Sequence, residues 1–381
     1  MTIKRDLLKT KFFAPSLRAD LVARPRLQGL LEEGLRQNLP LTLVSAPAGY
    51  GKSTLIVAWL QQHEAQPATS RLHTAWVSVD DDDDNPSRFF AYLAAAIQEA
   101  GINWMPPEQH VWEFTGSPSP ETILISLLNE LNELAGQASL ILVLDDYHRI
   151  RSPVIHEALQ FAVEHAPPNL HIILITREDP PLTLARWRAR ARLTEIRAAD
   201  LRFNPEETAD FLARTMALHL SANEITVLET RTEGWVAGLQ LAALALKASY
   251  LETNQSAATF ITSFSGTHRY IIDYLMEEVL RRQDNIVRDF LRHTSVLERL
   301  CPSLCDAVTG RDNGRERLTQ LERANAFLIP LDNQRKWYRY HHLMADSLQS
   351  GLDRQTRDIV HRRAAQWHEA NGLHIEAVRH A

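Results

Sequence analysis

The sequence predicts an α/β protein with a doubly wound parallel sheet in its first half and helical parts, with one short hairpin, in its second. Short unbroken apolar runs alternate with amphipathic stretches between residues 41 and 200. A glycine-rich loop directly follows the first run, and beyond residue 204 the strand signal fades. Because apolar strands alternating with helices are typical of a parallel sheet covered on both faces, we expect that architecture here.

Five apolar runs supply the predicted strands. They are residues 41–45, 74–79, 140–144, 171–176 and 193–197. Amphipathic segments between them, such as residues 54–62 and 86–100, predict helices that cover the sheet.

The second half begins with a helix that opens at Pro205, with Asn204 as its cap and acidic residues favourably placed in its first turn. Helical patterns continue to about residue 298. Two apolar runs around the polar turn 332–335 then predict a β-hairpin, and residues 342–352 predict a helix. Helices followed by a hairpin indicate a winged-helix module. Residues 353–381 resemble one helix pair of a repeat array, and a lone repeat cannot bury its own face, so we expect a longer array.

Composition limits the functional classes. The 381 residues suggest two or three domains, and 45% apolar residues can form ample core. The net charge of −6 argues against DNA phosphate as the main partner. No apolar run approaches the roughly 20 residues of a membrane helix, and the N-terminus lacks a signal-peptide pattern, so we expect a cytoplasmic protein without membrane contact. Cys301 and Cys305 predict plain buried thiols.

The strongest motif is Ala-Pro-Ala-Gly-Tyr-Gly-Lys-Ser-Thr at residues 46–54, between a predicted strand and a predicted helix. In such a phosphate loop the backbone N–H groups cradle phosphate oxygens, the lysine reaches the β and γ phosphates, and a hydroxyl holds Mg²⁺. Ala46 replaces the usual first glycine, but the strand–loop–helix context favours a nucleotide site over a chance turn. The candidate binding residues are Ala48, Gly49, Tyr50, Gly51, Lys52, Ser53 and Thr54.

Two further strand ends carry candidate chemistry. Asp145 and Asp146 end a strand that we expect beside the phosphate-loop strand. There Asp145 is a candidate Mg²⁺ ligand and Asp146 a candidate residue to orient or deprotonate water, although paired aspartates are also common as a cap or turn. Arg177 ends another strand, where its cation could interact with the γ-phosphate or form an ordinary surface ion pair. The acidic run 80–84 favours a solvated loop with a helix cap over a metal site.

Taken together, the motifs resemble those of the STAND class of P-loop ATPases, and in particular the MalT-like, ATP-binding regulators of the LuxR family. The resemblance covers essentially the whole chain. It is carried by RPRL at 24–27, SAPAGYGKSTL at 45–55, WVSVDDDDDNPSRFFAYL at 76–93, LVLDDYHRI at 142–150, LITREDPPLTLARWRARARLTEIRAADLRF at 174–203, EGWVAGLQLAALAL at 233–246 and YRYHHLMADSL at 338–348. It implies a P-loop NTPase domain at 1–203, a helical domain at 204–285, a winged-helix domain at 286–352 and the start of superhelical repeats at 353–381.

The resemblance also implies roles for particular residues. Arg177 would sense the γ-phosphate of ATP, and the segment 22–26, with Arg24 and Arg26, would lie near the adenine. His341 falls where related proteins place a winged-helix histidine that touches the β-phosphate of ADP. Two departures concern neighbouring positions: Gln240 stands where many relatives have proline, and His342 stands where aspartate is usual.

The function that follows is a Mg²⁺-dependent ATP/ADP switch in a transcription regulator, closed with ADP and self-associating with ATP, with slow hydrolysis. An inducer would act through the repeat domain, of which we expect this sequence to contain only the start, and DNA would bind only through a C-terminal helix-turn-helix, which we do not expect in this sequence. Two alternatives remain: a motor or loading ATPase stimulated by nucleic acid, and a scaffold that keeps ADP as a structural cofactor.

Overall fold

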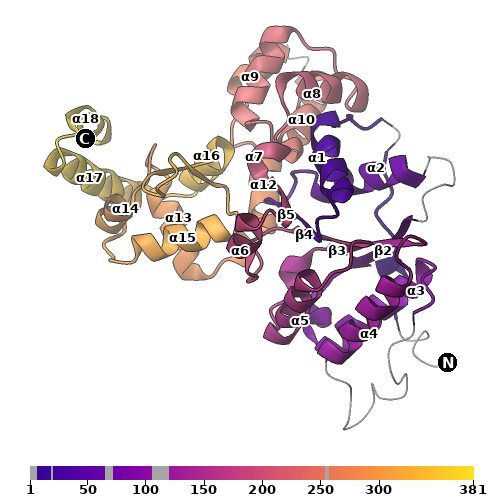
Figure 1. Ribbon diagram of the computed structural model, residues 1–381. Coiled ribbons are helices and arrows are strands. Elements are labelled where there is room, and N and C mark those ends of the chain that lie inside the picture. The colour runs from indigo at the N-terminus through magenta and orange to yellow at the C-terminus, as the bar shows by residue number, and fades with distance from the viewer. Residues whose placement is uncertain (1–6, 19, 65–71, 105–119, 254–256) are drawn as a thin grey trace. The chain divides into compact units, whose positions relative to one another are not determined.

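A computed structural model describes residues 7–18, 20–64, 72–104, 120–253 and 257–381 (Figure 1). The chain forms two compact units, and each is described by itself. The first contains most of the chain up to Leu201; the second contains the chain from Arg202 together with two short stretches, Asp20–Val22 and Pro47–Tyr50. The division therefore runs through the phosphate loop.

The first unit is built on a five-stranded parallel sheet with the strand order β2-β3-β4-β1-β5. The strands are β1 (Leu41–Ser45), β2 (Leu72–Ser78), β3 (Ser139–Asp145), β4 (Leu170–Thr176) and β5 (Leu193–Arg197). All five predicted strands are confirmed to within two residues. One expectation was wrong: β4 lies between β1 and β3, so the strand that carries Asp145 is not beside the phosphate-loop strand. Strand order is set by tertiary pairing, which neighbouring motifs in a sequence do not specify.

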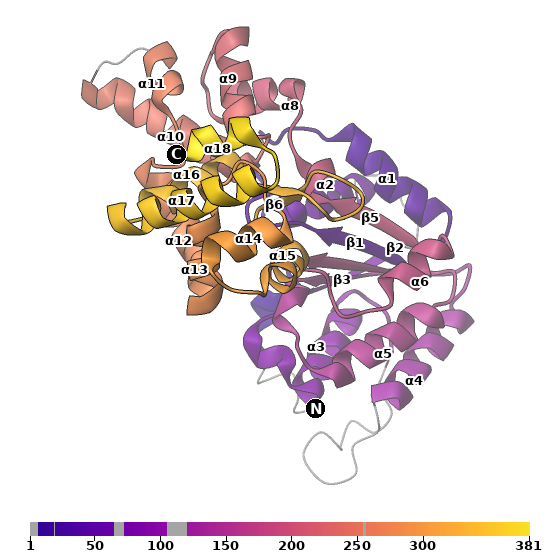
Figure 2. The ribbon, with the colours of Figure 1, turned by 90° about the vertical axis from the view of Figure 1, so that its left-hand side faces the viewer.

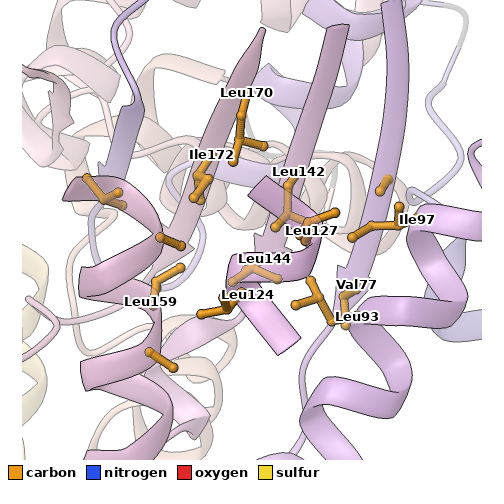
Figure 3. Close-up of a cluster of buried hydrophobic side chains, with 14 of the residues drawn as sticks. Val77, Leu93, Ile97, Leu124, Leu127, Leu142, Leu144, Leu159, Leu170 and Ile172 are labelled. Carbon is orange, nitrogen blue, oxygen red and sulfur yellow. The ribbon is translucent and has the colours of Figure 1, made fainter. Parts of the chain in front are cut away.

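Helices cover both faces of this sheet (Figure 1). On one face lie α1 (Pro25–Arg36) and α2 (Lys52–Glu64), and on the other α3 (Pro86–Glu99), α4 (Pro120–Glu133) and α5 (Pro153–Glu164). Shorter elements are η2 (Lys9–Phe12), η3 (Asp81–Asp84), η4 (Tyr147–Arg149), α6 (Leu184–Ala189) and α7 (Ala198–Leu201). The main core lies between the sheet and the second helical layer. Figure 3 shows its buried side chains, among them Val77, Leu93, Ile97, Leu124, Leu127, Leu142, Leu144, Leu159, Leu170 and Ile172.

The acidic run is a folded element. Asp81–Asp84 form the 3₁₀ helix η3, which Asp80 caps, and Asn85 caps α3 by accepting from the N–H of Arg88 at 3.2 Å. The expected solvated loop was wrong for Asp83, whose buried carboxylate pairs with Lys11 and, at 3.0 Å, with Arg88 Nε. Two partners offset the cost of burying that charge. Among the described residues no group of three or more His, Cys, Asp or Glu side chains could hold a metal ion.

In its described residues, the second unit consists of helices and one β-hairpin. Asn204 caps α8 with a reciprocal pair of bonds to Glu207, which confirms the predicted cap. Its helices are α8 (Pro205–Asp210), the π-helical η5 (Phe211–Thr215), α9 (Ala222–Thr232), α10 (Val236–Thr253), α11 (Ala257–Ser263), α12 (Arg269–Glu278), η6 (Leu280–Arg282), α13 (Asn285–Thr294), α14 (Pro302–Thr309), α15 (Gly314–Arg323), α16 (His342–Ser350), α17 (Arg354–Ala370) and α18 (His374–His380). In the described part of the chain, no helix combines the length and apolar character needed to span a membrane.

The predicted hairpin is present as β6 (Leu328–Pro330) paired antiparallel with β7 (Tyr338–Tyr340). Its turn is held by Asp332, whose carboxylate accepts from the N–H groups of Gln334, Lys336 and Trp337. Helices α13 to α15 precede this hairpin, as a winged helix requires, and α17 packs along α18 near the C-terminus (Figure 2). Both cysteines are buried free thiols, as predicted. The two-unit division does not separate a helical from a winged-helix domain, so the boundaries at 285, 286, 352 and 353 stay a prediction.

Candidate functional site

The phosphate loop connects β1 to α2, the context that the motif predicts. Gly49 and Gly51 have φ values of 78° and 76°, in the left-handed region that favours glycine, so the motif needs both glycines to make its turn. Lys52 opens α2, and its Nζ donates to the carbonyl of Ala46 at 2.8 Å. The ammonium is therefore held back over the loop, with further donor capacity for phosphate oxygens.

Ser53 in the first turn of α2 and Asp145 at the end of β3 come together, although β1, which leads into the phosphate loop, is not a neighbour of β3. Ser53 Oγ donates to Asp145 Oδ1 at 3.0 Å, and the N–H of Asp146 donates to the same oxygen at 2.9 Å. Burial, and then the charge of Asp146, raise the pKa of Asp145 to about 6. A hydroxyl and a carboxylate side by side at a phosphate loop are hard oxygen donors, so this pair fits Mg²⁺.

Asp146 and Arg177 also meet at this edge of the sheet. Asp146 has φ 57° and ψ 34°, and its half-exposed carboxylate lies 3.9 Å from Arg177 Nε and 3.7 Å from His148 Nδ1. The side chain of Asp146 makes no cap bond to η4, so the cap alternative does not describe it. The left-handed backbone is uncommon for a residue other than glycine. The two neighbouring aspartates therefore have different surroundings: one buried, one accessible.

A network that the sequence did not suggest lies at the ends of three strands. Ser45, the last residue of β1, donates from Oγ to Asp179 Oδ1 at 2.9 Å. Asp179 also pairs with Arg197, the last residue of β5, and Arg197 Nη2 lies 2.6 Å from Glu195 Oε1. These bonds fix the end of β1 where the phosphate loop begins. Their signal in the sequence is weak, since the residues are about twenty to a hundred and fifty positions apart.

Arg24 and Arg26 are placed differently from each other. Arg24 is buried before α1, and its Nη2 donates to the carbonyls of Leu201 at 3.0 Å and Asp200 at 3.4 Å. Arg26 lies in the first turn of α1 and is exposed. Arg24 therefore ties the start of α1 to the end of α7, and the role of the pair toward adenine stays a prediction.

The first half of the phosphate loop belongs to the second unit, where it packs on the start of α10. Trp235 Nε1 donates to the carbonyl of Ala48 at 3.1 Å, and the N–H of Ala237 donates to the carbonyl of Gly49 at 3.0 Å. A Cβ placed on Gly49 would overlap Ala237 Cβ. Gly49 is thus needed for close packing as well as for its backbone conformation.

His341 lies in the same unit and is fully buried. Its Nε2 donates to the carbonyl of Thr232 at 2.9 Å, and its Nδ1 has no hydrogen-bond partner among the described residues. Burial lowers the pKa of His341 to about 4. Its ring packs against Trp235 and Phe327, with centroids 5.9 and 5.6 Å away, and Phe327 in turn contacts Tyr50. These four rings, called the aromatic cluster below, join the phosphate loop to the winged helix.

Two family profiles match this chain, one in each half. A family profile described as an AAA domain matches residues 36–179, and one described as the MalT winged helix domain matches residues 276–360. The chain is 33% identical to the HTH-type transcriptional regulator MalT of Vibrio cholerae, over 98% of this chain and 40% of that protein. It is also 33% identical to the serine/threonine-protein kinase PknK of Mycobacterium tuberculosis, over 98% of this chain and 33% of that protein.

A solved structure shares the fold. The Walker-type ATPase paby2304 of Pyrococcus abyssi superposes with a TM-score of 0.57 at 20% identity, covering 88% of this chain and 98% of that one. The chain is thus MalT-like in both its P-loop and its winged-helix parts. It spans about 40% of the length of the MalT relatives that it matches.

Proposed function

Proceeding from a P-loop domain joined to a MalT-type winged helix, we propose that this chain is the ATP/ADP switch of a cytoplasmic transcription regulator. In this proposal the ADP form is closed, the ATP form is open and self-associates, and slow hydrolysis resets the switch. In this proposal the transcriptional output and DNA contact correspond to those of the relative named as an HTH-type transcriptional regulator, and they would depend, like the inducer, on further parts of a longer protein.

The observation that supports a switch is the bonding of the phosphate loop itself. Two backbone carbonyls of the loop, those of Ala48 and Gly49, are bound by the start of α10, and Tyr50 belongs to the aromatic cluster that contains His341. A change of the loop on binding ATP in place of ADP would alter these contacts. A bistable element biased by the γ-phosphate is what a switch requires.

Each site residue has a role in the proposed chemistry. Lys52 and the loop N–H groups would bind the phosphates, while Ser53 and Asp145 would hold the metal, with Thr54 beside them in the first turn of α2. The metal, when bound, supplies positive charge that neutralises the phosphate oxygens. Asp146 would orient or deprotonate the attacking water, and Arg177, close to it, would sense the γ-phosphate.

His341 would act as the closed-state contact. Because its Nε2–H is used by Thr232, a bond to the β-phosphate of ADP needs a proton on Nδ1. A phosphate at hydrogen-bond distance favours that protonated form, which would reverse the effect of burial. The bond would therefore form only with nucleotide present, and such a charge-assisted bond changes an equilibrium about ten- to a hundredfold.

The switch is favoured over the two alternatives. A motor that acts on nucleic acid needs a basic channel, and the net charge is −6. The same region is about equally similar to a protein named as a regulator and to one named as a kinase, which suits a control module joined to different outputs. A scaffold that holds ADP would gain nothing from Asp146 and Arg177 placed together.

Titration of the protein with a fluorescent ATP analogue tests whether the phosphate loop binds nucleotide, which the proposal requires. We expect Lys52→Ala to abolish binding, because the Ala46 carbonyl holds the Lys52 ammonium at the phosphate loop, where it would bind the phosphates. Lys336→Ala, which removes an exposed lysine at the hairpin, is the matched control and should bind as the wild type does. Undiminished affinity in Lys52→Ala would overturn the phosphate site. An equal mass of the ADP and ATP complexes in light scattering would overturn self-association.

A further inference from the structure

One buried carboxylate in the second unit, that of Glu233, interacts with two arginines and one backbone N–H group. Glu233 lies between α9 and α10 and is 7% exposed at its side chain. Arg339 of β7 forms a two-pronged pair with it, Nη1 to Oε1 and Nη2 to Oε2, both at 2.7 Å. The N–H of His342 donates to Oε1 at 3.0 Å, and Arg202 Nη2 lies 3.5 Å from Oε2.

The backbone at this point is constrained. Glu233 has φ 49°, in the left-handed region, and it is followed by Gly234 with φ 68°. A Cβ on Gly234 would overlap the carbonyl oxygen of Phe203, and the N–H of Phe203 donates to the carbonyl of Gly234 at 2.9 Å. A glutamate that holds this conformation next to a packed glycine suggests that its side chain is needed there.

The corner 232–237 contacts the winged helix with its first residues and the phosphate loop with its last. Thr232 and Glu233 bind the segment 339–342 through the His341 ring, the His342 N–H and the Arg339 side chain. Trp235 and Ala237 bind the carbonyls of Ala48 and Gly49. Six consecutive residues therefore contact both the winged helix and the phosphate loop.

Arg202 adds a second path through side chains alone. Its guanidinium interacts with the hydroxyl of Tyr50, a residue that is 2% exposed, and its Nη2 lies 3.5 Å from Glu233 Oε2. Burial raises the pKa of Tyr50, so the phenol stays neutral. For Glu233, burial opposes ionisation, but bonds from Arg339 outweigh it and lower the pKa to about 2. The carboxylate is therefore charged at neutral pH.

We propose that Glu233 is the positioning residue that couples the winged helix to the phosphate loop, by holding Arg339 on one side and, through Arg202, the Tyr50 hydroxyl on the other. This inference rests on the proposed nucleotide switch. It identifies the residue that transmits a change in the phosphate loop to the winged helix. When the loop moves, Tyr50 carries Arg202 with it, and Glu233 must then give up part of its bonding to the winged helix.

The test compares Glu233→Gln with wild-type protein in two measurements, the dissociation rate of fluorescent ADP and the mass of the ADP complex by light scattering. Glutamine keeps the shape and removes the charge, so we expect ADP to leave about tenfold faster or more, and the variant to self-associate without ATP. Glu298→Gln, which removes an exposed carboxylate paired with Arg379, is the control and should behave as wild type.

Two further variants separate coupling from general destabilisation. The first is a double variant that exchanges the two charges, Glu233→Arg with Arg339→Glu. It should release ADP more slowly than either single variant does, and a merely structural role of Glu233 would not produce this rescue. Tyr50→Phe removes only the hydroxyl that Arg202 binds and should speed ADP release while the melting temperature stays within a few degrees; this variant decides the matter if Glu233→Gln does not fold.

The outcomes distinguish the two proposals. If wild-type protein has the same mass with ADP and with ATP, the switch itself is wrong. If wild type switches, but Glu233→Gln and Tyr50→Phe release ADP at the wild-type rate, then Glu233 does not couple the two parts and this inference is overturned.

Discussion

At the scale of single residues, the two aspartates at the end of β3 show how one backbone conformation gives neighbouring carboxylates different surroundings. Asp145 continues the strand into a buried position, where Ser53 reaches it, and Asp146 turns through a left-handed conformation toward Arg177 and solvent. A buried carboxylate next to a hydroxyl group is a good pair of oxygen ligands for a cation. An accessible carboxylate next to an arginine is well placed to interact with water, while the arginine could interact with a γ-phosphate.

Asp146→Asn should slow ATP hydrolysis while ATP binding stays nearly unchanged. An amide keeps the shape of the carboxylate but cannot accept the proton of the attacking water, and assistance of this kind contributes about 10²–10⁴-fold. A single-turnover assay with radiolabelled ATP measures it, with Asp312→Asn, an exposed aspartate far along the chain, as the control. An unchanged single-turnover rate would remove Asp146 from the chemistry.

The pKa of Asp145 leads to a prediction about pH. Because burial and Asp146 raise this pKa to about 6, protons compete with Mg²⁺ for the carboxylate below that pH. The affinity of the nucleotide complex for Mg²⁺ should therefore fall as the pH decreases from 7 to 5. Calorimetric titration in Asp145→Asn, which retains the titration of the nucleotide's own phosphate, should show a weaker affinity and a smaller pH dependence. Equal pH dependence in the two proteins would contradict a metal role for Asp145.

At the scale of elements, the start of α10 makes contacts with the phosphate loop that its helical sequence pattern does not predict. Trp235 and Ala237 bind two carbonyls of the phosphate loop, and the same indole packs on Phe327 and His341. The corner 232–237 thus binds the phosphate loop and also supplies one ring, that of Trp235, to the aromatic cluster. This dual packing explains why Gly49 has no room for a side chain.

A pair of glycine substitutions tests this packing. Gly49 and Gly51 have nearly the same φ, so Gly→Ala costs similar backbone strain at both, but only at Gly49 would the new Cβ meet other atoms within 4 Å. We expect Gly49→Ala to lower the free energy of unfolding without nucleotide by about 1–3 kcal/mol more than Gly51→Ala does. Urea denaturation followed by tryptophan fluorescence measures both. Equal destabilisation would mean that the loop does not pack on α10.

At the scale of the whole molecule, charge and winged-helix character point in different directions. A winged helix is a common DNA-binding module, yet the whole chain carries 47 acidic and 41 basic residues. In the described hairpin the turn arginine, Arg335, is already paired with Glu322 of α15. His341 and Arg339 of the winged helix bind Thr232 and Glu233 at the end of α9, so this part of its surface makes contacts inside the protein.

We therefore expect this chain not to bind DNA in a sequence-specific manner. Electrophoretic mobility shifts with promoter fragments and a scrambled duplex, in about 150 mM salt where nonspecific phosphate contacts weaken, give the measurement. A shift that depends on the sequence of the duplex and survives this salt concentration would contradict the prediction.

The sequence by itself determined the local elements and the chemistry of the phosphate loop. The five strands, the Asn204 cap, the hairpin turn and the strand–loop–helix around Lys52 depend on side-chain pattern and local hydrogen bonds, which are written in neighbouring residues. Asp145 and Arg177 could be selected because the carboxyl ends of parallel strands share one edge of a sheet.

Only the tertiary structure decided which distant groups meet. The sequence did not reveal that β4 separates β1 from β3, that Asp83 is buried by Lys11, or that Ser45, Asp179 and Arg197 bind one another. The sequence also did not single out Glu233, which in the sequence is one polar residue between two predicted helices. In the structure it pairs with Arg339, which is more than a hundred positions away in the sequence. The physical reason is that burial and long-range pairing depend on how elements pack against each other, and local sequence pattern carries little of that information.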